Sequence, residues 1–309
     1  MEWSCQVKSI LHYSTAPLLL VVLLSCHRSP GESKQKLWQE FSGEKTLAHV
    51  QRLVDFGPRP PGSEAIEKSR AYIDNQLRLC GWNVERQSFT ETTPRGAVTF
   101  VNLIARFAAE PHSTPKFLLC SHYDTKFFEN IRFVGANDGG SSTALLLEFA
   151  RIFAPHPALA ARVELVFFDG EEAYEKFSAN DGLYGSRYFA KHLAADPAAR
   201  QLRGAVLFDM VGDRSLNVTL PLDSPSQMAH DLFAAAEALK LREYFSYYDG
   251  AITDDHTPLN AIGIPALDVI DFDYAWWHTA DDTIDKLSAA SLQVVGSVAA
   301  RYLVEFALK

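Results

Sequence analysis

Four short, mostly apolar segments constrain the fold of this chain more than any other feature of its sequence. They lie at residues 117–120, 163–168, 205–208 and 266–270, and stretches with helical spacing separate them. Strands without regular polar alternation are typical of a parallel sheet whose two faces are both covered by helices. The pattern therefore predicts an α/β fold, a single-domain three-layer sandwich with a mixed, mostly parallel central sheet.

The segments around these four complete the arrangement. Residues 65–79 have helical spacing, with Ser63 as the expected N-cap and Gly81 as the stop signal. Further strands are expected at 83–89 and 98–105, and further helices at 142–153, 184–193, 228–239 and 289–308. A chain of 309 residues with one such pattern fits a single enzyme-sized domain.

Polar clusters follow each of the four apolar segments. In open α/β sheets, ligands bind beyond the carboxyl ends of the parallel strands, which meet at one edge. Several carboxylates that converge there repel one another and lose hydration unless a cation holds them. The clusters are residues 121–124, 169–172, 209 and 276–278, together with Asp138 in the loop 135–140 before a helix. The set predicts a metal site, although any single member has an ordinary explanation as a cap or a solvated side chain.

The chemistry of these side chains favours zinc. Histidine with carboxylates and without cysteine suits zinc, which in catalytic sites keeps three protein ligands and one open position. The open position can take a water molecule or a substrate carbonyl, and this makes such a site catalytic.

Six stretches occur along the chain in an informative order. They are His122-Tyr123-Asp124-Thr125-Lys126, the loop ending in Asp138, Phe167-Phe168-Asp169-Gly170-Glu171-Glu172-Ala173, Leu183-Tyr184-Gly185-Ser186-Arg187, Asp254-Asp255-His256-Thr257-Pro258 and Trp277-His278-Thr279. In this order they resemble the glutaminyl cyclases (glutaminyl-peptide cyclotransferases) of the animal type, within the M28 clan of zinc aminopeptidases. The Glu-Glu pair is common to the clan, whereas the stretches at 123–126, 183–187 and 254–258 resemble the cyclases specifically. The similarity runs from about residue 56 to the C-terminus.

The resemblance implies a reaction and a role for individual residues. It implies one zinc ion, and an acyltransferase that cyclises the N-terminal glutamine of peptides or proteins to pyroglutamate and releases ammonia. The matched positions are Asp138, Glu172 and His278 for the zinc ligands, Glu171 for the general acid and base, Asp254 for a carboxylate near the reacting amine, Asp209 for one that shares a proton with Glu171, and Trp277 for an aromatic pocket wall. We expect Asp209 to raise the proton affinity of Glu171 by like-charge proximity.

Two other functions remain open at this point. A two-zinc aminopeptidase of the M28 type would use His122 and Asp209 as ligands of a second metal, Asp138 as the bridge and Glu171 to activate water. A cell-surface binding protein with an inactive site would need a broken ligand set, and all the matched ligands are present. One zinc with pyroglutamate formation distinguishes the cyclase from an enzyme with two zincs that releases free amino acids.

The sequence also departs from the cyclase pattern. Phe177 stands where the cyclases place a second pocket tryptophan, so it is the expected second wall of the substrate pocket. The residues after Asp138 are closer to those of ordinary aminopeptidases of the clan. The cysteine pair of the family near this loop is missing, because no cysteine lies near Thr143. A cis peptide after the bridging aspartate, common in the family, is a hypothesis for Gly139.

The N-terminal segment predicts export. Lys8 and His12 precede an apolar run at 16–24 that is too short to span a bilayer and suits a signal peptide. The stretch Leu23-Leu24-Ser25-Cys26 resembles a bacterial lipobox, with a plain secretory signal as the alternative. We expect a signal peptide at 1–25, a lipid-anchored tether at 26–40 and the catalytic domain at 41–309. The protein would then be a bacterial cell-envelope lipoprotein on the periplasmic or surface side, in contact with the membrane only through this anchor.

Charge and cysteine content limit the partners. The formal net charge of −9 and the lack of a Lys or Arg run argue against a nucleic-acid partner. Once Cys5 and Cys26 are assigned to the leader and the anchor, Cys80 and Cys120 remain. A disulfide between them suits an oxidising compartment, but Cys120 lies inside an apolar strand, which favours two free thiols. The oligomeric state is left open.

Overall fold

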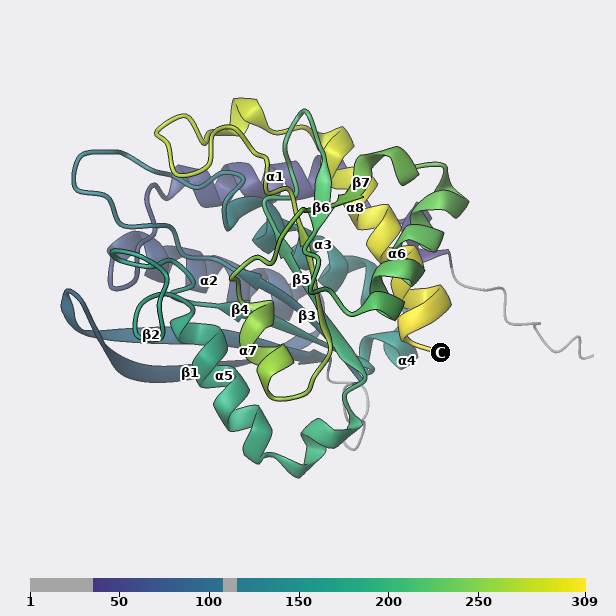
Figure 1. Ribbon diagram of the computed structural model, residues 1–309, viewed down its shortest axis with the longest axis horizontal. Helices are drawn as coiled ribbons and strands as arrows, with labels where there is room; N and C mark the ends of the chain where they lie inside the picture. The colour runs from purple at the N-terminus through teal and green to yellow at the C-terminus, as the bar shows by residue number, and fades with distance from the viewer. Residues whose placement is uncertain (1–35, 108–115) are drawn as a thin grey trace, which may run out of the picture. The chain divides into compact units, whose positions relative to one another are not determined.

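A six-stranded sheet with helices on both faces organises the molecule (Figure 1). The computed structural model describes residues 36–107 and 116–309. The strand order is β1-β2-β4-β3-β5-β8, in which β4, β3, β5 and β8 run parallel and the β1–β2 hairpin joins antiparallel through β2. The strands are β1 (Trp82–Thr93), β2 (Gly96–Phe107), β3 (Phe117–His122), β4 (Val163–Phe168), β5 (Gly204–Asp209) and β8 (Ala266–Ile270). The expected mixed, mostly parallel sheet is confirmed.

The apolar composition of the central strands follows from burial on both faces. Along β3, Phe117 and Leu119 point into the larger hydrophobic core, while Leu118 and Cys120 point into a second core on the opposite face. Side chains alternate between the two faces of a strand, so both sets must be apolar when helices cover both faces. Cys120 is fully buried, and both Cys80 and Cys120 are free thiols.

Two layers of helices cover the sheet. The larger core lies under α1 (Gly43–Asp55), α2 (Glu64–Leu79), α3 (Gly140–Phe153), α6 (Ser226–Leu239) and α8 (Ala289–Tyr302). The second core lies under α5 (Tyr184–Ala195) and α7 (His256–Ala261) (Figure 1). Ser63 caps α2 as expected, since its hydroxyl accepts a hydrogen bond from the Ile66 N–H at 3.1 Å.

Some elements were not expected from the pattern. Helix α1 begins after the N-cap Ser42 and buries Val50 and Leu53 against α3 and α8. A short helix α4 (Pro157–Ala160) follows α3, and β6 (Val218–Leu220) pairs with β7 (Phe245–Tyr247) in a separate two-stranded sheet. Helix α8 gives way at its end to a π-helical turn, Leu303–Ala307, within the helix expected at 289–308.

The N-terminal predictions lie outside the described residues. The signal peptide, the lipobox with Cys26 and most of the expected tether fall within residues 1–35. The described part of the chain begins at Lys36, and Leu37 and Trp38 already pack into the larger core. Among the described residues, no helix combines the length and the apolar character needed to cross a membrane.

Candidate active site

The strand order brings the polar clusters together. Strand β3 lies between β4 and β5 in the sheet. The chain passes from β3 to β4 through α3 on one face and from β4 to β5 through α5 on the other, and a crevice forms at the carboxyl edge where the order reverses. His122 ends β3, Asp209 ends β5, and Glu171 and Glu172 follow β4 within four residues. The expected convergence at one edge is what the structure shows.

Asp138, Glu172 and His278 form one group of potential metal ligands. Their ligand atoms all lie within 4.8 Å of one another. Nε2 of His278 is 3.1 Å from Glu172 Oε2 and 3.5 Å from Asp138 Oδ2. Two ligands bound at about 2.0–2.1 Å to a tetrahedral ion are roughly 3.3 Å apart, so the spacing fits zinc.

His122 and Asp209 form a second group around the same aspartate. Nε2 of His122 is 3.2 Å from Asp138 Oδ1 and 3.2 Å from Asp209 Oδ1. Asp138 therefore offers one carboxylate oxygen to each group, which is the arrangement of a bridging ligand. The hydrogen bond that Asp209 makes is with His122, whereas the resemblance paired Asp209 with Glu171.

The backbone is strained beside two of these side chains. His278 and Met210, which directly follows Asp209, have positive φ angles of 56° and 48°. This left-handed conformation costs a residue other than glycine about 1–3 kcal/mol, and such strain concentrates at functional sites. The surrounding structure holds these side chains at the edge of the crevice despite that cost.

Asp282 and Tyr274 fix the backbone of the loop that carries Asp138. The Asp282 carboxylate accepts hydrogen bonds from the N–H groups of Asn137 at 2.8 Å and Asp138 at 3.1 Å. The Tyr274 hydroxyl donates to Asp282 Oδ1 at 2.8 Å. Asp138 is thus held by its own N–H, and its side chain is left available to a ligand.

Arg59 holds the same loop from its other side. Its buried guanidinium donates to the carbonyl oxygens of Val134 at 2.6 Å, Gly135 at 3.0 Å and Tyr123 at 3.2 Å. The sequence did not indicate Arg59 and Asp282, because they bind backbone groups that no residue pattern reveals, nor Tyr274, which contacts the loop only through Asp282.

Asp124 orients His122 and the two glutamates that follow β4. Its Oδ1 lies 3.4 Å from Nδ1 of His122, and its carboxylate accepts hydrogen bonds from the N–H groups of Glu171 at 3.2 Å and Glu172 at 3.4 Å. A carboxylate behind a histidine fixes the ring and raises its strength as a ligand. The sequence placed Asp124 in the cluster after β3 but assigned it no role.

Gly139 gives a test of this packing. It is the N-cap residue of α3 and has φ of 73°, and a Cβ at this position would lie 2.7 Å from the Asp124 carbonyl oxygen and 2.9 Å from Cε1 of His122. We expect Gly139→Ala to displace His122, to lower the free energy of unfolding by more than about 1–3 kcal/mol and to reduce activity. Urea unfolding and steady-state rates measure both effects.

Gly62 provides the matched control. It has φ of 84°, but no atom lies within 4 Å of the position that its Cβ would take. Gly62→Ala therefore reports the cost of the backbone conformation alone. Equal losses of stability in the two variants would show that the contact of Gly139 with His122 and Asp124 is not needed.

A small cavity opens onto the first group. Its volume is about 190 Å³, and Asp138, Glu172 and His278 line it together with Glu171 and Asp254. Its apolar lining comprises Phe177, Met210, Ile252, Ile270, Phe272 and Trp277. Trp277 stacks on His278 with ring centroids 4.1 Å apart. The expected walls Phe177 and Trp277 both line the cavity, which encloses one side chain rather than a length of peptide.

Burial controls the ionisation of the free carboxylates in this cavity. Burial raises the pKa of Glu171 well above its ordinary value of 4.5, and the carboxylates of Glu172 and Asp254 add to the shift although His122 opposes it. Burial, with Asp209 as the next cause, likewise raises the pKa of Asp254. Burial, Glu172 and Asp254 thus raise the pKa of Glu171, and the proton that Asp209 is expected to share with Glu171 stays a prediction. A carboxylate with a raised pKa is suited to exchange protons near neutral pH.

His256, expected to be structural, lies in a further buried group. Nδ1 of His256 is 3.5 Å from Asp268 Oδ2, and Asp254 completes the group within 4.8 Å. Burial lowers the pKa of His256 to about 4, so its ring is neutral near neutral pH. This group shares Asp254 with the cavity but does not include the expected zinc ligands.

The donor set fits a zinc ion. Asp138 is almost fully buried, and its Oδ2 makes no hydrogen bond. Burial and the adjacent Glu172 raise the pKa of Asp138 to about 7, although a hydrogen bond from His122 opposes the shift, and a bound cation would favour its ionised form. Two carboxylates and one imidazole around this orphaned oxygen match a catalytic zinc site with an open fourth position.

Comparison with known proteins identifies the family of the chain. The profile of the Peptidase family M28 matches residues 102–303. The glutaminyl-peptide cyclotransferase of Boiga irregularis is 31% identical over 82% of this chain and 78% of its own length. The chain belongs to the glutaminyl-peptide cyclotransferases of peptidase family M28.

Solved structures agree with this family. The glutaminyl cyclase of an Acidobacteriales bacterium superposes with a TM-score of 0.80 at 33% identity, over 87% of this chain and 95% of that one. A Zn-dependent exopeptidase from Parabacteroides distasonis superposes with a TM-score of 0.76 at 26% identity, over 85% and 98%. The cyclotransferase family inferred from the six stretches and the α/β fold predicted from the apolar segments are both confirmed.

The departures from the cyclotransferase pattern have structural counterparts. Thr143, near which the family pattern has a cysteine, donates its hydroxyl to the His122 carbonyl at 2.8 Å. The Ser121 hydroxyl donates to the Ser142 hydroxyl at 2.9 Å, so hydroxyl groups connect β3 to α3. The cis peptide hypothesised at Gly139 is wrong, because the described residues contain no cis peptide bond.

Asp271, directly after β8, makes the stability of this cyclotransferase depend on pH. Burial, with Asp273 as the next cause, raises the pKa of Asp271 from 3.8 to about 9. Between these values the folded chain holds a proton that the unfolded chain has lost, so stability falls as pH rises. This group contributes a slope of about −1.4 kcal/mol per pH unit. We expect Asp271→Asn to remove that part of the slope in melting curves from pH 5 to 8.

The exposed Asp249 serves as the comparison for this experiment. Asp249→Asn removes the same kind of charge without burial and should leave the slope unchanged. Parallel slopes for the wild type and the Asp271→Asn variant would contradict the assignment.

Proposed function

We propose that this chain cyclises the N-terminal glutaminyl residue of peptides and proteins, with one zinc ion held by Asp138, Glu172 and His278. The observation that carries the proposal is the cavity of about 190 Å³, which places these three side chains beside the proton-accepting carboxylates Glu171 and Asp254. Relatives named glutaminyl-peptide cyclotransferase support the same reaction. A zinc ion, when bound, would supply the Lewis acid that polarises the γ-amide carbonyl.

The residues of the cavity then divide the work. The α-amine attacks the γ-carbonyl carbon of the same residue, and the amide nitrogen leaves as ammonia. Glu171 takes the proton from the amine and returns it to the departing nitrogen, which suits a carboxylate of raised pKa. Asp254 accepts a hydrogen bond from the amine and orients it. Phe177 and Trp277 hold the side chain folded back, so the reaction gains from orientation.

A second function has a specific observation in its favour. Asp138 offers separate oxygens to the His278 group and to the His122 and Asp209 group, as a two-metal aminopeptidase requires. In that enzyme, Glu171 would activate a water molecule. The supporting relatives favour the cyclase, and metal content separates the two functions.

One experiment distinguishes these reactions directly. The purified protein is incubated with zinc and a peptide that begins with glutamine, and the products are weighed by mass spectrometry. Loss of one ammonia is the expected result. Loss of the whole first residue would establish the aminopeptidase and end the cyclase proposal.

We further propose that the protein is exported and anchored by a lipid on Cys26. The stretch Leu23-Leu24-Ser25-Cys26 and the apolar run before it support this localisation. The expected result is a protein in the membrane fraction of a bacterial host that the Cys26→Ser variant releases. Equal partition of both forms into the soluble fraction would refute the anchor.

A further inference from the structure

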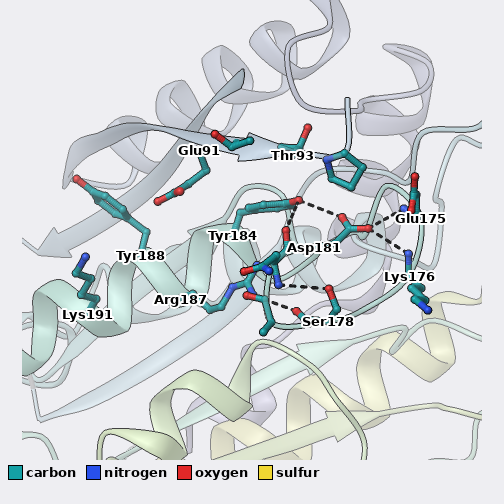
Figure 2. A pocket seen from close by; sticks show the side chains of 14 residues that line it. Glu91, Thr93, Glu175, Lys176, Ser178, Asp181, Tyr184, Arg187, Tyr188 and Lys191 are labelled. Atoms are coloured by element: carbon teal, nitrogen blue, oxygen red, sulfur yellow. Dashed lines mark hydrogen bonds between the residues drawn. The ribbon is translucent and has the colours of Figure 1, made fainter. Parts of the chain in front are cut away.

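A second, larger cavity lies beside the active site and has no role in the reaction described above. It is a groove of about 640 Å³ between the tip of the β1–β2 hairpin, the loop 175–182 and one side of α5 (Figure 2). Glu91 and Thr93 come from the hairpin, and Tyr188 and Lys191 come from α5. Lys191 and Tyr188 lie at one end of the groove, and Glu175 and Lys176 lie at the other (Figure 2).

The groove and the catalytic cavity lie at the same edge of the sheet. Strand β2 runs antiparallel to β4, and Leu103 pairs with Phe167 near the carboxyl end of β4. The residues of β2 before Leu103, and the hairpin tip beyond them, therefore extend past that carboxyl end. At the tip, the guanidinium carbon of Arg95 lies 4.1 Å from the ring centroid of Phe127. The ring of the next residue, Phe128, packs against the His278 ring with centroids 5.9 Å apart.

A single loop separates the two cavities. Phe177 lines the catalytic cavity, while its neighbours Lys176 and Ser178 line the groove. The Asp181 carboxylate accepts hydrogen bonds from the N–H groups of Glu175 at 2.8 Å and Lys176 at 3.1 Å (Figure 2). Phe177 thus faces one cavity and its two neighbours face the other, and the Asp181 carboxylate holds the backbone of the loop before Phe177.

Arg187 fixes the other half of this loop. Its guanidinium donates to the carbonyl oxygen of Ser178 at 3.1 Å (Figure 2). It also donates to the carbonyl oxygens of Ala179 and Gly182. The side chains of Asp181 and Arg187 therefore form hydrogen bonds to the backbone of the loop, and neither is free to bind an ion in the groove. Such a preorganised wall gives up little entropy when a ligand binds against it.

The sizes of the two cavities indicate what occupies the groove. The catalytic cavity encloses one side chain, so the rest of a peptide must leave through its mouth, and the groove has more than three times its volume. The exposed side chains Glu91, Glu175, Lys176 and Lys191 line it with two charges of each sign, and Tyr188 adds an aromatic ring. Mixed charge with aromatic surface suits a polypeptide of varied sequence better than a phosphate or another anion.

We propose that this groove binds the residues that follow the N-terminal glutamine of a peptide substrate. The inference rests on the proposed cyclase function and adds an extended subsite to it. The chain of the substrate passes over Phe177 and lies between the hairpin tip and α5. Peptides and flexible protein N-termini, rather than single amino acids, are then the substrates that use the full binding surface.

The test blocks the groove without touching the catalytic cavity. Ala179→Trp places a large side chain in the groove from an exposed position. With a glutamine-initiated hexapeptide, we expect kcat/KM to fall about tenfold or more, while kcat/KM for glutamine α-amide stays within about twofold. Ala238→Trp is the matched control, because Ala238 is also exposed and its carbonyl also accepts a hydrogen bond from an arginine, Arg301, at 3.0 Å.

A charge reversal provides a second variant that does not depend on the fold tolerating tryptophan. We compare two hexapeptides, one with acidic and one with basic residues after the glutamine. Lys191→Glu should raise the ratio of kcat/KM for the basic hexapeptide to kcat/KM for the acidic one by roughly two- to fivefold. The groove proposal would be overturned if Lys191→Glu left this preference unchanged. It would also be overturned if Ala179→Trp lowered kcat/KM equally for glutamine α-amide and for the hexapeptide. A change in oligomeric state without a change in substrate selectivity would instead assign the groove to a second copy of the chain.

Binding measured without turnover keeps the two proposals apart. Calorimetric affinity for the hexapeptide should fall in Ala179→Trp and stay constant in Ala238→Trp. If the wild type binds the hexapeptide through the groove but forms no pyroglutamate, the cyclase proposal is wrong and peptide binding in the groove is supported. If the wild type forms pyroglutamate and Ala179→Trp binds the hexapeptide as tightly as the wild type does, the groove proposal is wrong and the cyclase proposal is supported.

Discussion

Glu171→Gln should lower kcat/KM for a glutamine-initiated peptide by about two to four orders of magnitude, which is the usual contribution of a general base. The substitution keeps the shape of the side chain and removes the group that exchanges the proton. The N–H of residue 171 still donates to Asp124, so the backbone that also positions Glu172 remains in place. Zinc content should therefore equal that of the wild type, and rates with metal analysis measure both quantities.

Glu237→Gln on the exposed side of α6 is the control for this substitution. It should leave kcat/KM unchanged. A Glu171→Gln variant with wild-type turnover would end the mechanism, whatever its metal content. Loss of both turnover and zinc would mean that Glu171 supports the metal group and would leave its role in proton transfer without support.

His278→Ala should abolish activity together with zinc binding. The imidazole lies 3.1 Å from Glu172 Oε2 and is the only nitrogen donor of its group. Removal of a partner behind a ligand already costs about 10–100-fold in metal affinity, and removal of the ligand itself costs more. Zinc per chain after dialysis, measured by atomic emission, should fall from one to near zero.

His122→Ala is the informative comparison, because His122 belongs to the second group around Asp138. Under the one-zinc cyclase, the variant keeps its zinc. Under the two-zinc aminopeptidase, the wild type holds two ions and His122→Ala loses one of them. A wild-type stoichiometry of two would therefore contradict the cyclase assignment, and thermal melting confirms that the variant is folded.

The central strands could be predicted from sequence because burial on two faces leaves a strong compositional signal. Val163–Phe168 is a strand over the range expected, and Ala266–Ile270 is another. Helix α1 was not expected, because polar residues outnumber the apolar ones along it, although Leu47, Val50 and Val54 have helical spacing and pack against the larger core. The two-stranded sheet of β6 and β7 was missed because strands of three residues are too short for any periodicity.

The types of ligand and the edge of the sheet at which they gather could be predicted from the sequence, but the hydrogen bonds between the site residues could not. His122 and Asp209 are far apart in sequence and adjacent in space only because β3 and β5 pair. Asp282 and Arg59 act on backbone N–H and carbonyl groups, and such contacts leave no residue pattern. The groove was likewise invisible, because it depends on how far the β1–β2 hairpin extends past β4.

The position of the metal is the most direct test of the account. Anomalous diffraction at the zinc edge, from crystals of the protein with zinc, locates the ion and counts it. The account predicts one peak within about 2.0–2.2 Å of a carboxylate oxygen of Asp138, a carboxylate oxygen of Glu172 and Nε2 of His278. A peak at another place, or a crystal structure that holds Asp138 and His278 apart with no ion between them, would contradict it.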